Sequence, residues 1–222
     1  MLELLTSETP NGWKVSILLE ELGVPYTVTP IALTDRVQKQ DWYVALNPNG
    51  RIPTLIDHEA GDFAVFESGA ILLYLAEKYD RFIPADTQAR SQVIQWVMWQ
   101  MSGLGPMMGQ ATVFNRYFEE KLPSVIDRYT RESQRLLGVL DAQLTTRDYL
   151  VGDYSIADIA CFPWVRGHDW AGVELDGFPH LLRWYDRIAK RPAVQRGLLV
   201  PEPPSAQDMA EKTILQGKTI IA

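Results

Sequence analysis

The sequence contains little of the chemistry that cysteine and histidine supply. Its 222 residues include one cysteine, Cys161, and three histidines at scattered positions. One cysteine excludes an internal disulfide and any metal site built from several cysteines, and the histidines are too few and too dispersed for a zinc site. We therefore expect no bound metal and a reducing compartment, the cytoplasm.

Positive charge and long apolar runs are also scarce. The chain has 21 lysines and arginines against 28 acidic residues, a net charge of −7, which argues against nucleic acid or an anionic membrane as a partner. No run approaches the roughly 18 apolar residues of a membrane-spanning helix, and no secretory signal opens the chain. An anionic small molecule is still compatible with this charge, because the local charge of a pocket can oppose the net charge.

The patterns that are present divide the chain into two parts. Its length and its 46% of hydrophobic residues suit two small domains with real cores. Residues 1–80 alternate strand and helix in the order βαβ and then ββα, which predicts a small mixed sheet covered by helices. From Pro84 onward only helical periodicity remains. We predict an α/β domain at 1–82, an all-helical domain at 88–200 and a loosely ordered tail at 201–222.

The stretch Thr9-Pro10-Asn11-Gly12 follows a short apolar strand and opens an amphipathic helix. Thr9 is typical of a helix N-cap, and a proline suits the first helical position because its missing N–H has no partner there. The open N–H groups and the dipole at such a helix start also favour a bound anion, including a thiolate. Taken alone, the stretch is explained more simply as an ordinary helix start.

Two further pairs lie at the ends of predicted strands. Ile52-Pro53 precedes a strand, and because only about 5% of X–Pro bonds in folded proteins are cis, the residues alone favour the trans form. Glu67 and Ser68 separate a strand from a helix, where Ser68 can cap the helix and Glu67 can bind an ammonium group. The pair suits the zwitterionic end of an amino acid, but a plain cap and a solvated glutamate explain it equally well.

The motifs in the second half of the chain indicate how it folds, and we assign them no catalytic role. Ser155, with Asp158 three residues later, resembles a capping box at a helix start. Cys161 lies among apolar residues of the same helix, so we expect it in the core. Segment 96–108 is rich in Trp and Met, which indicates core packing and is also compatible with the wall of an apolar pocket. Within it, we expect Gly103-Leu104-Gly105-Pro106 to break a helix.

Taken together, these motifs resemble the cytosolic glutathione transferase family over nearly the whole chain. Within that family the sequence is most similar to the nu class, bacterial disulfide-reducing enzymes related to the yeast prion-forming nitrogen regulator. The likeness is carried by Thr9-Pro10-Asn11-Gly12, Asn47-Pro48-Asn49-Gly50-Arg51-Ile52-Pro53, residues 66–75, Gly103-Leu104-Gly105-Pro106-Met107 and residues 155–161. The resemblance implies a thioredoxin-like α/β N-terminal domain, an all-α C-terminal domain and a homodimer.

The resemblance also implies a glutathione site. Ile52 would bind the cysteinyl unit through its backbone, and Pro53 would then follow a cis bond. Glu67 and Ser68 would hold the γ-glutamyl end of the peptide.

Other implied ligands lie further apart in the sequence. Gln38 and Arg51 would lie near the glycyl carboxylate or the neighbouring backbone, and Arg128 aligns with an arginine that nu-class proteins direct at the bound thiol peptide. The first-turn tyrosine, serine or cysteine of other classes is absent. Thr9 and Asn11 stand in that region and are the implied catalytic residues.

The activity that the resemblance implies is glutathione-dependent reduction of small disulfides, with weaker conjugation of electrophiles. Two alternatives remain open from the residues. One is an enzyme that mainly conjugates apolar electrophiles, which the segment 96–108 would favour. The other is a non-catalytic glutathione-binding regulator, which the intact site residues disfavour.

Overall fold

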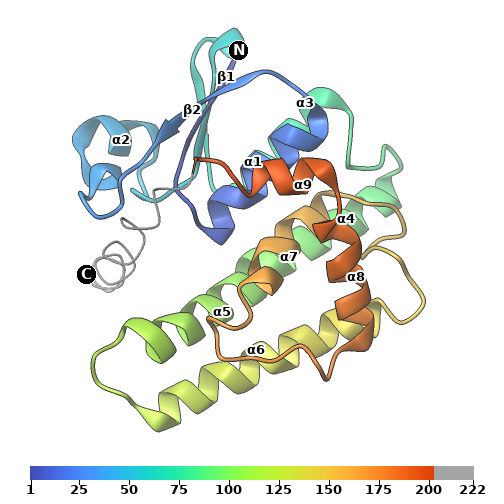
Figure 1. Ribbon diagram of the computed structural model, residues 1–222. Helices are drawn as coiled ribbons and strands as arrows, with labels where there is room; N and C mark the ends of the chain where they lie inside the picture. The colour runs from blue at the N-terminus through green and yellow to red at the C-terminus, as the bar shows by residue number, and fades with distance from the viewer. Residues whose placement is uncertain (203–222) are drawn as a thin grey trace. The chain divides into compact units, whose positions relative to one another are not determined.

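Strands and helices alternate in the N-terminal part of the computed structural model, which describes residues 1–202 (Figure 1). The elements are β1 Leu2–Thr6, α1 Pro10–Leu22, β2 Tyr26–Pro30, the short η1 Val37–Lys39, α2 Asp41–Leu46, β3 Thr54–Asp57, η2 His58–Ala60, β4 Phe63–Phe66 and α3 Ser68–Tyr79. The predicted order of βαβ and then ββα is confirmed. Residues 203–222 of the predicted tail lie outside the described residues.

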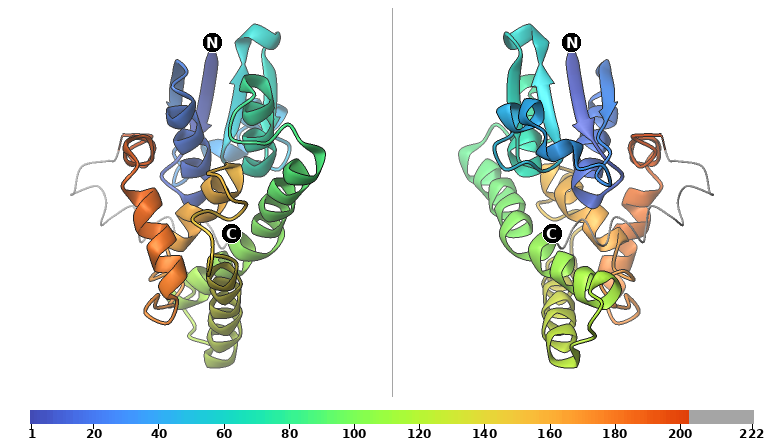
Figure 2. Two further views of the ribbon diagram at one scale, coloured as in Figure 1. Left: turned by 90° about the vertical axis from the view of Figure 1, so that its right-hand side faces the viewer. Right: turned by 90° about the vertical axis from the view of Figure 1, so that its left-hand side faces the viewer.

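The four strands form one mixed sheet in the order β2-β1-β3-β4. β1 is parallel to β2 and antiparallel to β3, and β3 is antiparallel to β4. Helices α1 and α3 cover one face of the sheet, and α2 covers the other (Figures 1 and 2). Tyr43 of α2 is buried in a cluster with Leu5, Ile31 and Ile56. Because both faces of the central strands are covered, the apolar residues of these strands can be buried on both sides.

Residues 82–190 form a second compact unit that is built from helices. Its elements are α4 Thr87–Trp99, the π-helical turn η3 Gln100–Leu104, α5 Gly105–Thr112, the π-helical turn η4 Val113–Tyr117, α6 Pro123–Gln143, α7 Ile156–Arg166 and α8 Pro179–Ala189. The all-helical character predicted for this region is confirmed. Within residues 1–202, no helix is long and apolar enough to cross a membrane.

The expected helix break at Gly103-Leu104-Gly105-Pro106 is wrong. The backbone stays helical from Thr87 to Tyr117, and the N–H of Gly105 bonds to the carbonyl of Gln100 in the π turn η3. Such a wider turn interrupts the usual hydrogen-bond ladder by itself, so the missing N–H of Pro106 in the next turn costs little.

The capping box predicted at Ser155 is present at the start of α7. The Ser155 hydroxyl accepts from the N–H of Ala157 at 3.3 Å, and Asp158 accepts from the N–H of Ser155 at 3.1 Å. Asp158 is fully buried and also accepts from the indole N–H of Trp184 at 2.8 Å. Cys161, on the same helix, is buried as expected.

The short helix α9, Pro192–Gly197, belongs to the first unit, which within the described residues comprises 1–81 and 191–202. Ser16 of α1 donates a hydrogen bond to the carbonyl of Gly197 at 2.7 Å, and Arg191 forms two bonds with Glu21 at 2.6 and 2.8 Å. The domain limits 1–82 and 88–200 remain a proposal from sequence. The contacts in the structure group α9 with α1.

Replacing Gly197 by alanine is expected to destabilise the first unit by about 1–3 kcal/mol, the usual cost of overpacking. A Cβ at this position would lie 2.6 Å from the Cα of Ile17 and 2.7 Å from its nitrogen. Chemical unfolding should show the loss. Gly177→Ala is the matched control, since a Cβ there meets nothing within 4 Å; equal stability of the two variants would contradict the close packing of α9 on α1.

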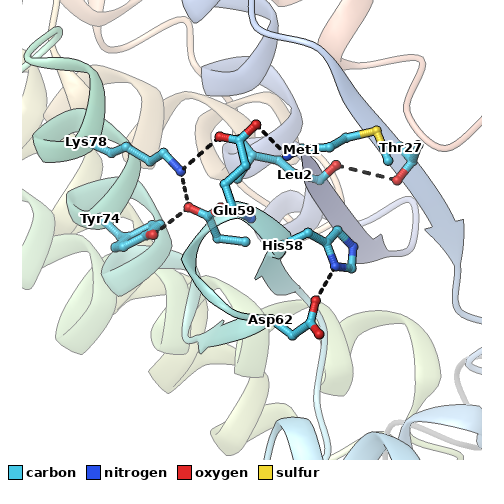
Figure 3. Close-up of polar contacts among 9 residues, drawn as sticks. Met1, Leu2, Thr27, His58, Glu59, Asp62, Tyr74 and Lys78 are labelled. Atoms are coloured by element: carbon cyan, nitrogen blue, oxygen red, sulfur yellow. Dashed lines mark hydrogen bonds and ion pairs between the residues drawn. The ribbon is translucent and has the colours of Figure 1, made fainter.

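A polar cluster fixes the end of β3 that is remote from Pro53 (Figure 3). Asp57 is fully buried and accepts hydrogen bonds from Tyr74 at 2.6 Å and from Lys78, both on α3. Figure 3 labels these two donors. Burial alone would raise the pKa of Asp57, but these hydrogen bonds and the Lys78 charge outweigh it and lower that pKa. Glu59 pairs with the amino group of Met1 at 2.8 Å. The cluster joins β3 to α3, and we assign it a structural role.

Candidate active site

Three segments of the first unit meet at one edge of the sheet. Thr54, the first residue of β3, pairs with Leu5 of β1 on one side and with Phe66 of β4 on the other. Because β1 and β4 both run opposite to β3, the chain leaves β1 and β4 at the edge where it enters β3. The register therefore brings together the start of α1, the Ile52-Pro53 corner and the start of α3.

Thr9 caps α1, as predicted. Its backbone is extended, and its Oγ1 accepts a hydrogen bond from the N–H of Gly12 at 3.2 Å. Pro10 is the first helical residue and Asn11, which is half-buried, is the second. A hydroxyl that accepts in this way keeps its own proton for donation. The first turn of α1 contains no acidic residue, so its positive dipole end remains suited to an anion.

Gly12 is the residue that lets α1 start so close to the end of β1. A Cβ at this position would lie 2.4 Å from the backbone oxygen of Ser7 and 2.4 Å from the hydroxyl of Thr6. No side chain fits such a gap. The glycine thus fixes the helix start directly above the strand end, and Thr9 and Asn11 are held at the sheet edge.

The peptide bond between Ile52 and Pro53 is cis. The resemblance implied this form, and the trans form favoured by the residues alone is wrong. Tyr43 and the Asn47 amide both donate to the carbonyl of Arg51, at 2.9 and 2.6 Å. Burial raises the pKa of the Tyr43 hydroxyl, and a tyrosine hydroxyl is already a donor at neutral pH without such a shift.

The start of α3 differs from the expected serine cap. Glu67, not Ser68, occupies the cap position, and its side chain makes no capping hydrogen bond. Its carboxylate instead accepts from the amide of Asn49 at 3.3 Å, which links α3 to the turn before Ile52-Pro53. Glu67 has φ of 69°, in the left-handed region that residues other than glycine seldom adopt. Strain of this kind often accompanies a functional site.

A buried lysine, which no sequence motif singled out, lies in the same region. Lys14 of α1 is 1% exposed and donates a hydrogen bond from Nζ to the hydroxyl of Ser68 at 3.2 Å; Ser68 is itself 3% exposed. The spacing of residues in the sequence could have indicated its burial, because Lys14 precedes Leu18 by four residues and so shares the buried face of the helix.

The remaining predicted ligands fall into two groups. Gln38 is buried in η1, and a Cβ at Gly50 would lie 3.0 Å from its carbonyl oxygen, so the turn that leads to Arg51 packs against η1. Arg128 lies in the second unit, where its side chain is 68% exposed and 3.8 Å from Glu132. The role of Arg128 toward a bound thiol stays a prediction. Among residues 1–202, no cluster of three or more His, Cys, Asp or Glu could hold a metal ion.

Comparison with known proteins defines the class. Residues 9–78 match the model of the glutathione S-transferase N-terminal domain, and residues 98–192 match that of the C-terminal domain. The chain belongs to the glutathione S-transferase family.

Individual relatives show which members of the family the chain is similar to. The chain is 41% identical to the disulfide-bond oxidoreductase YfcG of Escherichia coli, over 90% of this chain and 95% of the relative. A glutathione transferase from Burkholderia graminis with two glutathione molecules bound per subunit has a TM-score of 0.86 and 44% identity, covering 91% of this chain and 89% of its own. One from Pseudomonas putida, with one glutathione disulfide bound per subunit, has a TM-score of 0.85 and 42% identity, covering 90% and 91%.

Proposed function

We propose that this protein reduces small disulfides with glutathione, in the manner of the nu class. The observation that carries the proposal is that the start of α1, the cis Ile52-Pro53 corner and the start of α3 meet at one sheet edge. The names of the relatives support it. YfcG is called a disulfide-bond oxidoreductase, and the Pseudomonas putida protein was crystallised with the oxidised form of glutathione.

The residues at this edge fit the parts of glutathione. The backbone of Ile52 would bind the cysteinyl unit through N–H and C=O. The Glu67 carboxylate would bind the ammonium of the γ-glutamyl end, and Ser68 with the open N–H groups of α3 would bind its carboxylate. Gln38 and Arg51, at the packed turn, would hold the glycyl end.

The start of α1 would activate the thiol. A free thiol has a pKa of about 8.5, and hydrogen-bond donors and helix N-termini lower it. The Asn11 amide and the Thr9 hydroxyl would each donate to the thiolate. One such charge-assisted bond is worth about 1.5–3 kcal/mol, so two could lower the thiol pKa by a unit or more.

The reaction requires no thiol from the protein. The bound glutathione thiolate attacks one sulfur of the substrate disulfide, breaks the S–S bond and releases one substrate thiolate, which takes up a proton. A second glutathione thiolate attacks the glutathione sulfur of the resulting mixed disulfide and releases the second substrate thiol. Two glutathione molecules are thereby oxidised to one glutathione disulfide, and one substrate disulfide is reduced to two thiols.

We further propose that the protein acts as a homodimer in the cytoplasm, where glutathione is abundant and reduced. The family resemblance supports this assembly. Light scattering of the full chain would report twice the mass of 25.2 kDa if it is correct.

The function is tested by two assays on the same preparation. We expect fast reduction of hydroxyethyl disulfide, followed through coupled glutathione reductase, and slow conjugation of a chlorodinitrobenzene. The reverse ratio would make conjugation the main activity. Binding of glutathione without either reaction would favour a regulator. Cys161→Ala is the control, because the buried Cys161 takes no part in the mechanism; its disulfide reduction should stay within about twofold of the unmodified protein, as for substitutions away from the site.

A further inference from the structure

Three buried polar side chains close a ring of hydrogen bonds beside the Ile52-Pro53 corner. Asn47 donates from Nδ2 to the Thr54 hydroxyl at 3.1 Å, and Thr54 donates to the Tyr43 hydroxyl at 3.0 Å. Tyr43 and Asn47 both donate to the carbonyl of Arg51, at 2.9 and 2.6 Å. Tyr43 and Thr54 are fully buried, and Asn47 is 2% exposed. The proposed mechanism gives these three side chains no role.

The direction of each bond in the ring follows from its donors and acceptors. A carbonyl oxygen can only accept, so Asn47 presents its nitrogen to Arg51, and Tyr43 gives its single proton to the same oxygen. Tyr43 then accepts from Thr54, which accepts from the second N–H of Asn47. The oxygen of Asn47 accepts from the N–H of Asn49 at 3.1 Å. The hydroxyl and amide protons of the three side chains are thus used within the ring, and two donors occupy both lone pairs of the Arg51 oxygen.

The carbonyl of Arg51 determines where the N–H of Ile52 points, because the two groups belong to one peptide unit. In residues 1–202 the cis bonds are those before Pro53 and Pro201, so the bond between Arg51 and Ile52 is trans. In a planar trans unit the C=O and the N–H point in opposite directions. The carbonyl is directed into the buried ring, and the N–H of Ile52 is therefore directed away from it. Within residues 1–202 the N–H and C=O of Ile52 form no hydrogen bond.

We propose that Tyr43 and Asn47 are positioning residues for glutathione. By holding the Arg51 carbonyl in the ring, they direct the N–H of Ile52 toward the cysteinyl carbonyl of the peptide. This inference rests on the proposed function, since it assigns the ring to the same site. The ring members differ in their effect: Tyr43 and Asn47 bond to the carbonyl itself, whereas the Thr54 hydroxyl, among the described residues, bonds only to these two side chains.

Two substitutions that each break two bonds of the ring test the proposal. Tyr43→Phe removes one donor from the Arg51 carbonyl, together with the acceptor of the Thr54 proton. Thr54→Val is the matched control, because it also removes two bonds but leaves both donors on the carbonyl. Tyr43→Phe should weaken glutathione binding about three- to tenfold, the effect of one neutral hydrogen bond, and Thr54→Val should stay within about twofold of the unmodified protein. Calorimetric titration measures the affinities at a temperature at which circular dichroism shows all three proteins folded.

A modified ligand identifies the bond that is lost. A glutathione analogue with a methylene group in place of the cysteinyl carbonyl cannot accept from the N–H of Ile52. Its affinity should be the same for the unmodified protein and for Tyr43→Phe, because the ring acts through that acceptor alone. A ring that only stabilises the fold would not distinguish the two ligands.

Three results would overturn the proposal. They are unchanged glutathione binding in Tyr43→Phe, equal losses in Tyr43→Phe and Thr54→Val, and a loss in Tyr43→Phe that is equal for glutathione and the analogue. Failure of the unmodified protein to bind glutathione would instead refute the proposed function, and this inference with it. If a variant does not fold, a crystal structure of the unmodified protein with glutathione decides: the N–H of Ile52 should contact the cysteinyl carbonyl while Arg51 keeps both donors, and an Arg51 carbonyl turned out of the ring would refute the role.

Discussion

Asp158→Ala is expected to lower the free energy of unfolding by about 3–5 kcal/mol, which is a large part of the stability of an ordinary domain. The carboxylate is fully buried and accepts from the N–H of Leu150 at 2.9 Å, the N–H of Ser155 at 3.1 Å and the indole of Trp184 at 2.8 Å. Alanine would leave these donors buried without an acceptor and remove the capping box of α7.

A second effect of Asp158→Ala raises the free energy of unfolding, and it is smaller than the loss. Burial raises the pKa of Asp158 to about 6, although its hydrogen bonds act in the other direction. Keeping the carboxylate ionised at neutral pH thus costs about 3 kcal/mol, a cost that the alanine variant avoids. Each buried donor left without an acceptor costs about 1–3 kcal/mol, and the sum over several donors exceeds this gain. We therefore expect a net loss of stability. Chemical unfolding of Asp158→Ala beside Asp153→Ala, an exposed acid of the same segment, measures it.

The raised pKa also predicts a pH dependence. Between about pH 4 and pH 6 the folded state holds a proton on Asp158 that the unfolded chain has released, so stability falls as the pH rises through this window. Above pH 6 the contribution is constant. Asp158→Asn does not titrate, and the stability difference between the unmodified protein and this variant should therefore be larger at pH 5 than at pH 7. A pH-independent difference would contradict the raised pKa.

The fold could be predicted because its signals are local. The strand at residues 2–6 and the helix that starts at Pro10 follow from apolar periodicity and one proline, and Ser155 with Asp158 marks the start of α7. The helix break expected at Pro106 was wrong for a physical reason. The π turn before Pro106 arises from backbone hydrogen bonds, and the identity of the side chains does not reveal it.

Less of the site could be predicted from the sequence, since the site depends on contacts between residues that are distant along the chain. Residues 9, 53 and 67 meet only through the strand register, and the bond between Glu67 and Asn49 joins two turns that are 18 residues apart. Local reasoning also favoured a trans bond before Pro53 and a cap at Ser68. Neither expectation held: the Ile52-Pro53 bond is cis, and Glu67 occupies the cap position of α3.

Asn11→Ala is expected to lower the turnover number for disulfide reduction about 10–100-fold, while glutathione affinity changes less than about threefold. Asn11 is the second residue of α1, at the positive end of the helix dipole, and in our mechanism its amide donates to the glutathione thiolate. That bond exists only with the ionised thiol and the sulfur that develops charge during exchange. Its loss should therefore affect turnover far more than binding.

The pH profile separates this role from simple contact with the peptide. Without the Asn11 donor the pKa of bound glutathione should rise toward the value of a free thiol, and the alkaline rise of turnover should move to higher pH with it. Ultraviolet absorbance of the thiolate reports the same shift in the bound complex without turnover. Asn11→Asp is the matched variant: it keeps the size of the side chain but places a negative charge beside the sulfur, so its turnover should fall at least as far as that of alanine. Turnover that survives both substitutions would remove Asn11 from the mechanism and leave Thr9 and the helix dipole as the groups that stabilise the thiolate.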